Sequence, residues 1–344
     1  MGEITIRGAG IFGLSIAWEC ARRGAAVRVI DPFGPGAGSS GGLVGALAPH
    51  VPENWNAKKA FQFESLIMAE PFWAEVGGVA GQSAGYARTG RLQPLPDARA
   101  VARARERGEN ARSLWQGKAV WEVIASADAG PWAPDSPSGW LVRDTLTARM
   151  HPRMACAALV AALAARGVTI APDGEDRGRT VWATGIAGLA ALSEDIGKSV
   201  GTGVKGQAAL LRLDRADFPQ LFADAVHIVP HEDGTVAIGS TSERDYTDPT
   251  STDDQLDDVI ARACAAVPDL RGAEIIERWA GVRPRSRSRA PMLGPWPGRD
   301  GHYIANGGFK IGFGMAPRVA EVMADYLLED RDMIPEDFRV SASL

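Results

Sequence analysis

Three closely spaced glycines between a short apolar segment and a helical pattern constrain this sequence more than any other feature. Ile4–Ile6 is predicted to be a strand, and the residues after it follow the spacing G-x-G-x-x-G. These residues are Gly8, Ala9, Gly10, Ile11, Phe12 and Gly13. Between a strand and a helix, the first glycine permits a tight turn, the second lets the backbone approach a pyrophosphate, and the third allows close helix–strand packing. The N-terminal segment therefore predicts a βαβ unit that binds a dinucleotide.

An acidic residue and a second glycine-rich loop narrow the choice of cofactor. Asp31 follows the second predicted strand, Val27–Ile30, and stands 18 residues after Gly13, where a carboxylate can bind ribose hydroxyls. This arrangement suits NAD or the adenosine half of FAD. The loop Gly34–Gly45 follows almost at once. Its serine hydroxyls and glycine backbone amides favour FAD, because this longer cofactor needs additional contacts to its pyrophosphate and flavin. Gly201–Gly206 also matches the glycine spacing, but a strand follows it instead of a helix, so we reject it as a binding loop.

Composition excludes several classes of protein. Of the 344 residues, 45% are hydrophobic and 23% are charged, and the net charge is −5, as in ordinary globular proteins. No basic surface predicts nucleic-acid binding, and no apolar run reaches the ~20 residues of a membrane span. The three cysteines are isolated and the five histidines show no paired spacing, so we expect no metal site and a reducing, cytoplasmic location. No basic segment precedes the first strand, so we expect no signal peptide.

The pattern of predicted elements favours an α/β protein that is α+β overall, with a Rossmann-like FAD-binding domain and an inserted, antiparallel-sheet substrate domain. We predict a discontinuous FAD-binding domain of residues 1–85, 140–206 and 278–334, a substrate domain of residues 86–139 and 207–277, and a loose tail of residues 335–344.

Local signals predict where individual elements begin and end. Asp233-Gly234 predicts a hairpin between two alternating runs, and Ala98–Leu114 predicts a helix. Thr252 and Gln255 have the spacing of a capping box, which would open a helix that runs to Val267. Gly185 is expected to stop a strand.

Five motifs make the chain resemble the FAD-dependent family that includes D-amino acid oxidase, glycine oxidase and monomeric sarcosine oxidase. The resemblance extends over nearly the whole chain. The motifs are the loop Ser39–Pro49, Val181–Gly185, Lys205–Gln207, Trp279–Pro284 and Gly307–Gly312. The resemblance implies an enzyme that oxidises the C–N bond of a small amino acid or N-substituted amino acid, with hydride transfer to the flavin.

The resemblance also implies the residues of the site. Arg283 of the Gly-x-Arg-Pro motif and Lys310 of the terminal Gly-Phe-Lys loop would anchor the substrate carboxylate. Besides the first glycine loop and Asp31, the implied cofactor-binding residues are Ser39, Ser40, Gly45, Ala46, Leu47, Thr184, Gly185, Gly281, Arg283, Gly307, Gly308, Phe309, Lys310 and Ile311. No cysteine lies near either anchor in the sequence, so we expect the FAD to be non-covalent.

Departures from the family pattern leave the substrate open. Ser288 stands where the family usually has Asp, His151-Pro152 replaces Asp-Pro, and only nine residues separate Ala171 from Val181. Two other functions stay open at this stage. The chain could be the flavin subunit of a multi-protein dehydrogenase, passing electrons to a protein partner, or it could oxidise a 2-hydroxy acid. The sequence leaves undecided the exact substrate, whether oxygen or another electron acceptor is used, and the oligomeric state.

Overall fold

A mostly parallel sheet forms one end of the molecule. The computed structural model describes residues 2–344. The sheet has six strands in the order β16-β17-β10-β1-β2-β9, and only the β16–β17 pair is antiparallel. Its strands are β1 (Glu3–Arg7), β2 (Ala26–Ile30), β9 (Thr169–Ala171), β10 (Arg179–Trp182), β16 (Met292–Pro295) and β17 (His302–Asn306). Because β1, β2, β10 and β17 point the same way, the loops after them meet at one edge of the sheet.

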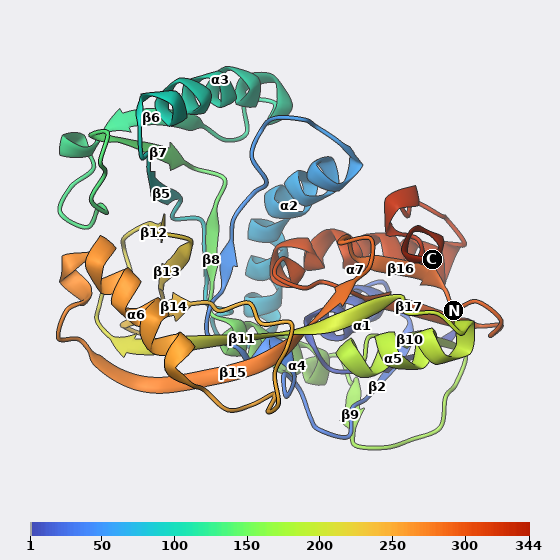
Figure 1. Cartoon of the computed structure of the whole chain (residues 1–344). Helices are drawn as coiled ribbons and strands as arrows, with labels where there is room; N and C mark the ends of the chain where they lie inside the picture. The colour runs from blue at the N-terminus through green and yellow to red at the C-terminus, as the bar shows by residue number, and fades with distance from the viewer. Residues whose placement is uncertain (1) are drawn as a thin grey trace.

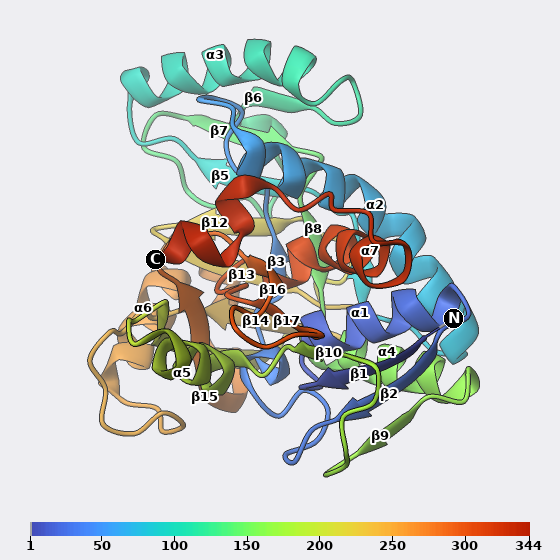
Figure 2. The same cartoon turned by 90° about the vertical axis from the view of Figure 1, so that its right-hand side faces the viewer.

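A layer of helices packs against this sheet, and its helices also pack against one another (Figures 1 and 2). The layer contains α1 (Ile11–Arg22), α2 (Ala57–Ala80), α4 (Pro152–Ala165) and α7 (Gly312–Glu329). Helix α1 is buried from Ile11 to Ala21 because α7 and α4 both pack on it, which explains its nearly uniform apolar sequence. A further helix, α5 (Gly185–Ile196), packs instead on β11 (Gly201–Arg212), β15 (Glu274–Ser286) and β17.

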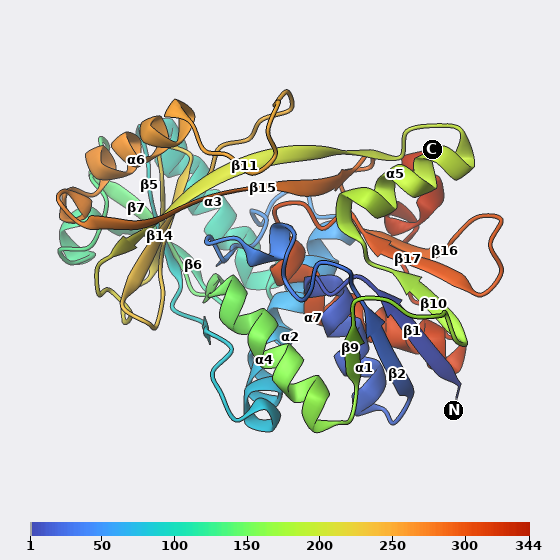
Figure 3. The ribbon, with the colours of Figure 1, turned by 90° about the horizontal axis from the view of Figure 1, so that it is seen from below.

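A second sheet of eight strands forms the other end. Its order is β15-β11-β14-β13-β12-β5-β7-β6, and only β12 and β5 are parallel. Its remaining strands are β5 (Arg91–Pro94), β6 (Trp121–Ala125), β7 (Trp140–Asp144), β12 (Gln220–Ala223), β13 (Val226–Pro230) and β14 (Thr235–Gly239). Helix α6 (Asp254–Ala266) packs on β11, β13 and β14, and α3 (Ala98–Leu114) packs on β6. Figure 3 shows β11 and β15 running side by side from the α6 end to the α5 end.

Short elements complete the chain. They are the three-stranded sheet of β3 (Ala46–Leu47), β8 (Ala148–Met150) and β4 (Tyr86–Ala87), and the 3-10 turns η1 (Ser39–Gly41), η2 (Ser126–Asp128), η3 (Pro268–Leu270), η4 (Glu336–Phe338) and η5 (Val340–Ser343). Across residues 2–344, no helix is both long and apolar enough to cross a membrane.

The predicted fold class is confirmed, and most predicted elements are present. The hairpin at Asp233-Gly234 joins β13 to β14, and the rejected Gly201–Gly206 match lies within strand β11. The predicted domain boundaries at 140, 206 and 278 fall at the start of β7 and inside β11 and β15, so the division into domains stays a prediction.

One local prediction was incomplete, and another was wrong. Gly185 does follow a strand, but it also begins α5, and its φ of 58° lies in the left-handed region that favours glycine. Helix α6 is capped by Asp253, whose side chain accepts a hydrogen bond from the Gln255 amide, rather than by Thr252. A carboxylate at this position also interacts favourably with the positive end of the helix.

The predicted loose tail was also wrong, because residues 336–343 pack as the turns η4 and η5. Phe338 is fully buried and its ring lies 4.8 Å from that of Phe61 on α2. Val340 is buried as well. The segment lacks helical periodicity, so only its contacts with distant residues could reveal its order.

We predict that Phe338→Ala destabilises the protein by about 3–5 kcal/mol, because it removes a buried ring and leaves a cavity. The control is Phe33→Ala, since the Phe33 side chain is 84% exposed and its loss should change stability by no more than about 0.5 kcal/mol. Urea unfolding of both variants measures the difference. Equal stabilities would show that the C-terminal segment does not contribute to the folded core.

Candidate functional site

The turn after β1 leaves a space over its middle glycine. Gly8 has a φ of 101°, and a Cβ there would lie 2.4 Å from the Ala183 carbonyl oxygen. A Cβ at Gly13 would lie 1.9 Å from the Gly8 carbonyl oxygen. A Cβ at Gly10 would meet only the Ser40 hydroxyl, at 3.2 Å. The outer glycines are therefore required by the fold itself, whereas Gly10 leaves room for a ligand to approach the backbone.

Two helix N-termini meet at this place without side-chain caps. Neither α1 nor α7 has a capping side chain, and the Ile11 amide donates to the Ser40 hydroxyl at 3.0 Å. Gly312 in the first turn of α7 approaches Ile11, since a Cβ there would lie 3.5 Å from the Ile11 Cγ2. The amides of Phe12 and Gly13 have no acceptor within the described residues. Free amides and the positive ends of two helices are the chemistry that binds a pyrophosphate.

Asp31 lies beside the same turn. One of its carboxylate oxygens accepts from the Ala9 amide at 2.7 Å, and the other accepts from the Phe33 amide at 2.9 Å. These two bonds fix the direction of the carboxylate, and each oxygen keeps a further lone pair for a hydroxyl donor. The residues of this edge therefore fit the pyrophosphate and ribose of FAD.

The second predicted loop packs against the first. Ser40 is buried in η1, and its backbone carbonyl accepts from the Cys156 thiol at 3.8 Å. A Cβ at Gly45 would lie 1.7 Å from the Met150 carbonyl oxygen, so the loop can approach β8 only as glycine. Ser40 thus lies at the N-terminus of α1, with Ser39 in the same turn. Gly45 precedes the short strand β3, Ala46–Leu47, which pairs with β8.

The remaining predicted loops follow β10 and β17, at the same edge of the sheet. Asn306, at the end of β17, donates to the Gly185 carbonyl at 2.7 Å and accepts from the Gly307 amide at 2.8 Å. A Cβ at Gly308 would lie 3.0 Å from the Phe12 ring. Thr184, Gly185 and the Gly307–Ile311 loop therefore gather around the first glycine turn, and their contact with FAD stays a prediction.

Arg283 lies on β15, and its guanidinium covers Gly206 of the neighbouring strand. A Cβ at Gly206 would lie 1.8 Å from the Arg283 Nη1. The guanidinium donates to the Ser240 hydroxyl at 2.7 Å and to the Thr241 carbonyl at 3.4 Å. Within residues 2–344, no carboxylate lies within 4.0 Å of it. Burial lowers the pKa of Arg283 to about 10, although the negative charge of Glu243 opposes this shift.

Glu243 does not form an ion pair with Arg283, because other groups hold it. Its carboxylate lies 3.7 Å from the ammonium of Lys205 and accepts from Gln207 at 3.1 Å and from the Thr241 hydroxyl. Lys205 and Glu243 are both buried. Arg283 is therefore an additional, unneutralised positive charge.

Lys310 lies close to Arg283 because a backbone hydrogen bond joins the loop of Lys310 to strand β15. The Phe309 amide, one residue before Lys310, donates at 3.0 Å to the carbonyl of Pro284, one residue after Arg283. The Lys310 side chain stays solvent-accessible, and partial burial together with the positive charge of Arg283 lowers its pKa. Two cations thus lie close enough for their charges to interact, and neither has an acidic partner in the described chain.

The other arginines of this segment behave differently from Arg283. Arg287 and Arg289 are exposed just beyond the end of β15, which is an edge strand. Arg285 is partly buried, and its guanidinium lies 5.6 Å from the centre of the Phe309 ring.

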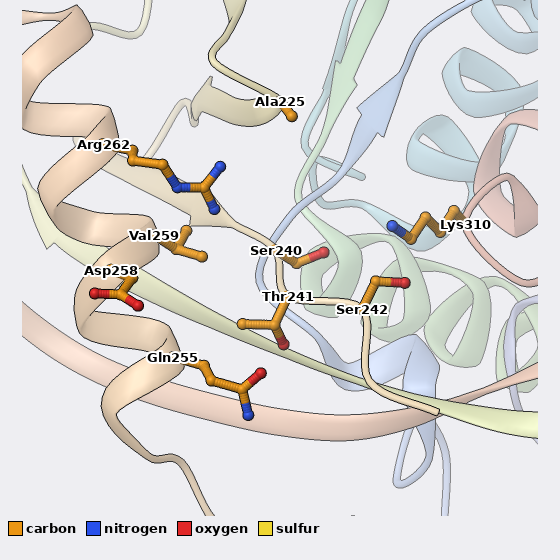
Figure 4. A pocket seen from close by; sticks show the side chains of 9 residues that line it. All are labelled: Ala225, Ser240, Thr241, Ser242, Gln255, Asp258, Val259, Arg262 and Lys310. Carbon is orange, nitrogen blue, oxygen red and sulfur yellow. The ribbon is translucent and has the colours of Figure 1, made fainter. Parts of the chain in front are cut away.

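A cavity of about 530 Å³ opens beside Lys310 (Figure 4). It is lined by Ala225, Ser240, Thr241, Ser242, Gln255, Asp258, Val259, Arg262 and Lys310. Sequence reasoning identified only Lys310 among these residues, because the others come from the loop after β14, from the β12–β13 turn and from α6, and no local motif connects them.

The charge of Lys310 also acts on His227. Burial, together with the positive charges of Arg91 and Lys310, lowers the pKa of His227 to about 3. Its Nδ1 is buried without a hydrogen-bond partner in the described residues. The imidazole is therefore neutral at physiological pH.

Several curated proteins are similar to this chain. A glycine oxidase of Geobacillus kaustophilus is 24% identical over 94% of this chain and 92% of its own length. A glycine oxidase of Pseudomonas putida is 34% identical, but the match covers only 36% of this chain and 34% of that protein. The chain therefore matches about a third of the length of this Pseudomonas relative.

Solved structures share the fold. The structure of glycine oxidase from Geobacillus kaustophilus superposes with a TM-score of 0.82 at 21% identity, covering 97% of this chain and 96% of that one. Iminodiacetate oxidase from Chelativorans sp. BNC1 gives a TM-score of 0.82 at 20% identity, covering 98% of both chains. The sequence pattern of the family described as FAD dependent oxidoreductase matches residues 3–326. Together with the glycine loops and the sheet topology, this match shows that the chain belongs to the FAD-dependent oxidoreductase family.

Proposed function

We propose that this protein is a FAD-dependent enzyme that oxidises the C–N bond of a small amino acid or N-substituted amino acid. The observation that carries the proposal is the pair of cations, Arg283 and Lys310, which lack acidic partners in the described structure and lie where the Gly307–Ile311 loop joins the cofactor edge to a cavity. Two such charges are complementary to a substrate carboxylate. The similarity to glycine oxidases supports the same class of substrate.

The chain's own residues would bind and orient the substrate. Arg283 offers a planar fork for two carboxylate oxygens, and Lys310 adds a mobile point charge. When bound, FAD supplies the acceptor for a hydride from the substrate α-carbon. A substrate whose carboxylate is fixed at one end can place only certain bonds next to the flavin. The binding energy of the carboxylate would therefore orient the reacting bond. The neutral His227 adds no charge that would compete for the carboxylate.

We further propose that the FAD is bound without a covalent link. Cys20 and Cys156 are buried, and burial raises the pKa of each thiol to about 12. Such thiols stay protonated and are poor nucleophiles. His50, the histidine at the edge of the second loop, is engaged by the Gln62 side chain. The three unpaired cysteines also support the predicted cytoplasmic location.

Gly10→Val is expected to abolish FAD binding, because its side chain would occupy the space over the α1 N-terminus. Gly10 has an ordinary extended backbone with a φ of −81°, so valine introduces no left-handed strain. Gly78→Val is the control, since no atom lies within 4 Å of a Cβ there and the residue is far from the turn in sequence. Absorbance of the purified proteins measures flavin content. Normal flavin content in the Gly10 variant would show that this turn does not bind the cofactor.

Arg283→Met should weaken binding of acetate to the FAD-loaded protein by tens- to thousands-fold, as expected for removing one member of a buried charge pair at about 2–5 kcal/mol. Lys310→Met should weaken it less, because lysine lacks the fork. The two effects should not add, since both residues contact one carboxylate. Titration followed by flavin absorbance measures affinity, with exposed Arg287→Met as the control. If both single variants bind acetate as well as the wild type, the carboxylate is held elsewhere.

Gly206→Ala tests whether the orientation of the Arg283 guanidinium matters, without removing its charge. The added methyl group would lie 1.8 Å from the Arg283 Nη1 and so must displace the flexible guanidinium. We expect acetate affinity to fall about tenfold or more, the equivalent of ~1.4 kcal/mol, while FAD stays bound. The same change in an Arg283→Met background should have no further effect. An equal loss in both backgrounds would show that Gly206 acts independently of Arg283.

Screening of FAD-loaded protein with D-amino acids, sarcosine, glycine and 2-hydroxy acids under anaerobic conditions tests the reaction itself. Bleaching of the flavin by an amino acid supports the proposal. Bleaching by 2-hydroxy acids alone would favour hydroxy-acid oxidation, and activity only with a co-purifying protein would favour a subunit of a larger dehydrogenase.

A further inference from the structure

The cavity beside Lys310 has a second cationic wall that a carboxylate anchor alone does not explain. Arg262 projects from α6 on the side opposite Lys310, and Figure 4 shows its guanidinium reaching toward Ser240 while the Lys310 ammonium points in from the other side. The two side chains come from elements at opposite ends of the molecule. A small substrate such as glycine would contact only the Lys310 side of a cavity of about 530 Å³.

The guanidinium of Arg262 is held in place but not neutralised. Its Nη1 donates at 2.9 Å to the carbonyl of Asp224 in the turn between β12 and β13. This bond uses one of five N–H donors and leaves the rest available. No carboxylate lies within 4.0 Å of Arg262 in the described part of the chain. The one acidic residue of the lining, Asp258, is exposed, and Figure 4 shows its carboxylate directed away from Ser240 and Lys310.

Several polar residues between the two cations can donate hydrogen bonds. Ser240 accepts from Arg283, so its own hydroxyl hydrogen stays free to donate. Ser242 lines the cavity next to Lys310, and Gln255 contributes an amide from α6. A cavity with donors along its length and a cation at each end is complementary to a ligand with acceptor groups at both ends.

Resting on the function proposed above, we propose that the substrate carries two acidic groups. One carboxylate binds Arg283 and Lys310, and a second, at the end of the side chain or of the N-substituent, binds Arg262. The substrate class is therefore a dicarboxylic amino acid or an N-carboxyalkyl amino acid rather than glycine itself. Arg262 acts as a specificity-determining residue that contacts the end of the substrate farthest from the reacting bond.

Equilibrium binding to the FAD-loaded protein tests this assignment. Acetate is compared with malonate, succinate and glutarate by flavin absorbance and by calorimetry. In the wild type, the best-fitting dicarboxylate should bind at least about tenfold more tightly than acetate, the gain expected for one added charge-assisted contact. Arg262→Gln should erase this advantage and leave acetate affinity unchanged. Arg262→Lys should restore part of it, which would exclude a folding defect as the cause.

Arg271→Gln is the matched control, because Arg271 is an exposed arginine that donates to the Cys264 carbonyl and does not line the cavity. It should keep the full dicarboxylate advantage. Three results would overturn the inference: no advantage in the wild type, an advantage that persists in Arg262→Gln, or an equal loss in Arg271→Gln.

The proposed function would be refuted by a different result from the one that refutes the role of Arg262. If acetate binding does not depend on Arg283 or Lys310, the first carboxylate is not anchored there, whatever Arg262 does. If acetate depends on both residues but dicarboxylates gain nothing, the anchor stands and the second acidic group is refuted.

Discussion

The long antiparallel pairing of β11 with β15 determines where the chemistry of this protein can lie. The two strands pair from Gly201 opposite Ser286 to Arg212 opposite Glu274, beginning beside α5 and ending in the outer sheet. In the middle of this pairing, Gly206 lies opposite Gly281, and neither carries a side chain. The missing side chains leave room for the Arg283 guanidinium on one glycine and for the Trp279 ring beside the other. A shift of one residue in this register would turn Arg283 to the opposite face of the sheet.

The hydrogen bonds around this pairing leave one positive charge without an acidic partner. Glu243 is a buried acid whose charge acts on Arg283, and Lys205, Gln207 and Thr241 already contact its carboxylate. Arg283 therefore remains partly dehydrated with neutral partners only, which accounts for its lowered pKa. A buried charge without a counterion is unfavourable in the free protein. The substrate carboxylate proposed above would remove that penalty, so part of its binding free energy would come from neutralising Arg283.

How much of this could be predicted from sequence depended on whether the signal was local. The strand–glycine–helix start, Asp31 and the loop around Ser40 lie close together in the chain, and each has its own recognisable pattern. Arg283 and Lys310 followed only from the family resemblance, since their proximity depends on the Phe309–Pro284 backbone bond. Arg262 has no motif at all, and it reaches the cavity because Leu256 and Ala263 bury the other face of α6. The tail was misjudged for the same reason, because its order comes from contact with Phe61.

The separate origin of the two cavity walls has a consequence for how such a scaffold diversifies. Lys310 belongs to the loop that leads into α7, which packs on α1 and the cofactor edge, whereas α6 packs mainly on the outer sheet and on η3. Exchanging side chains along the cavity face of α6 would then leave the redox machinery intact. A new ligand preference would then require changes in a single helix, with the glycine turns and Asp31 kept as they are.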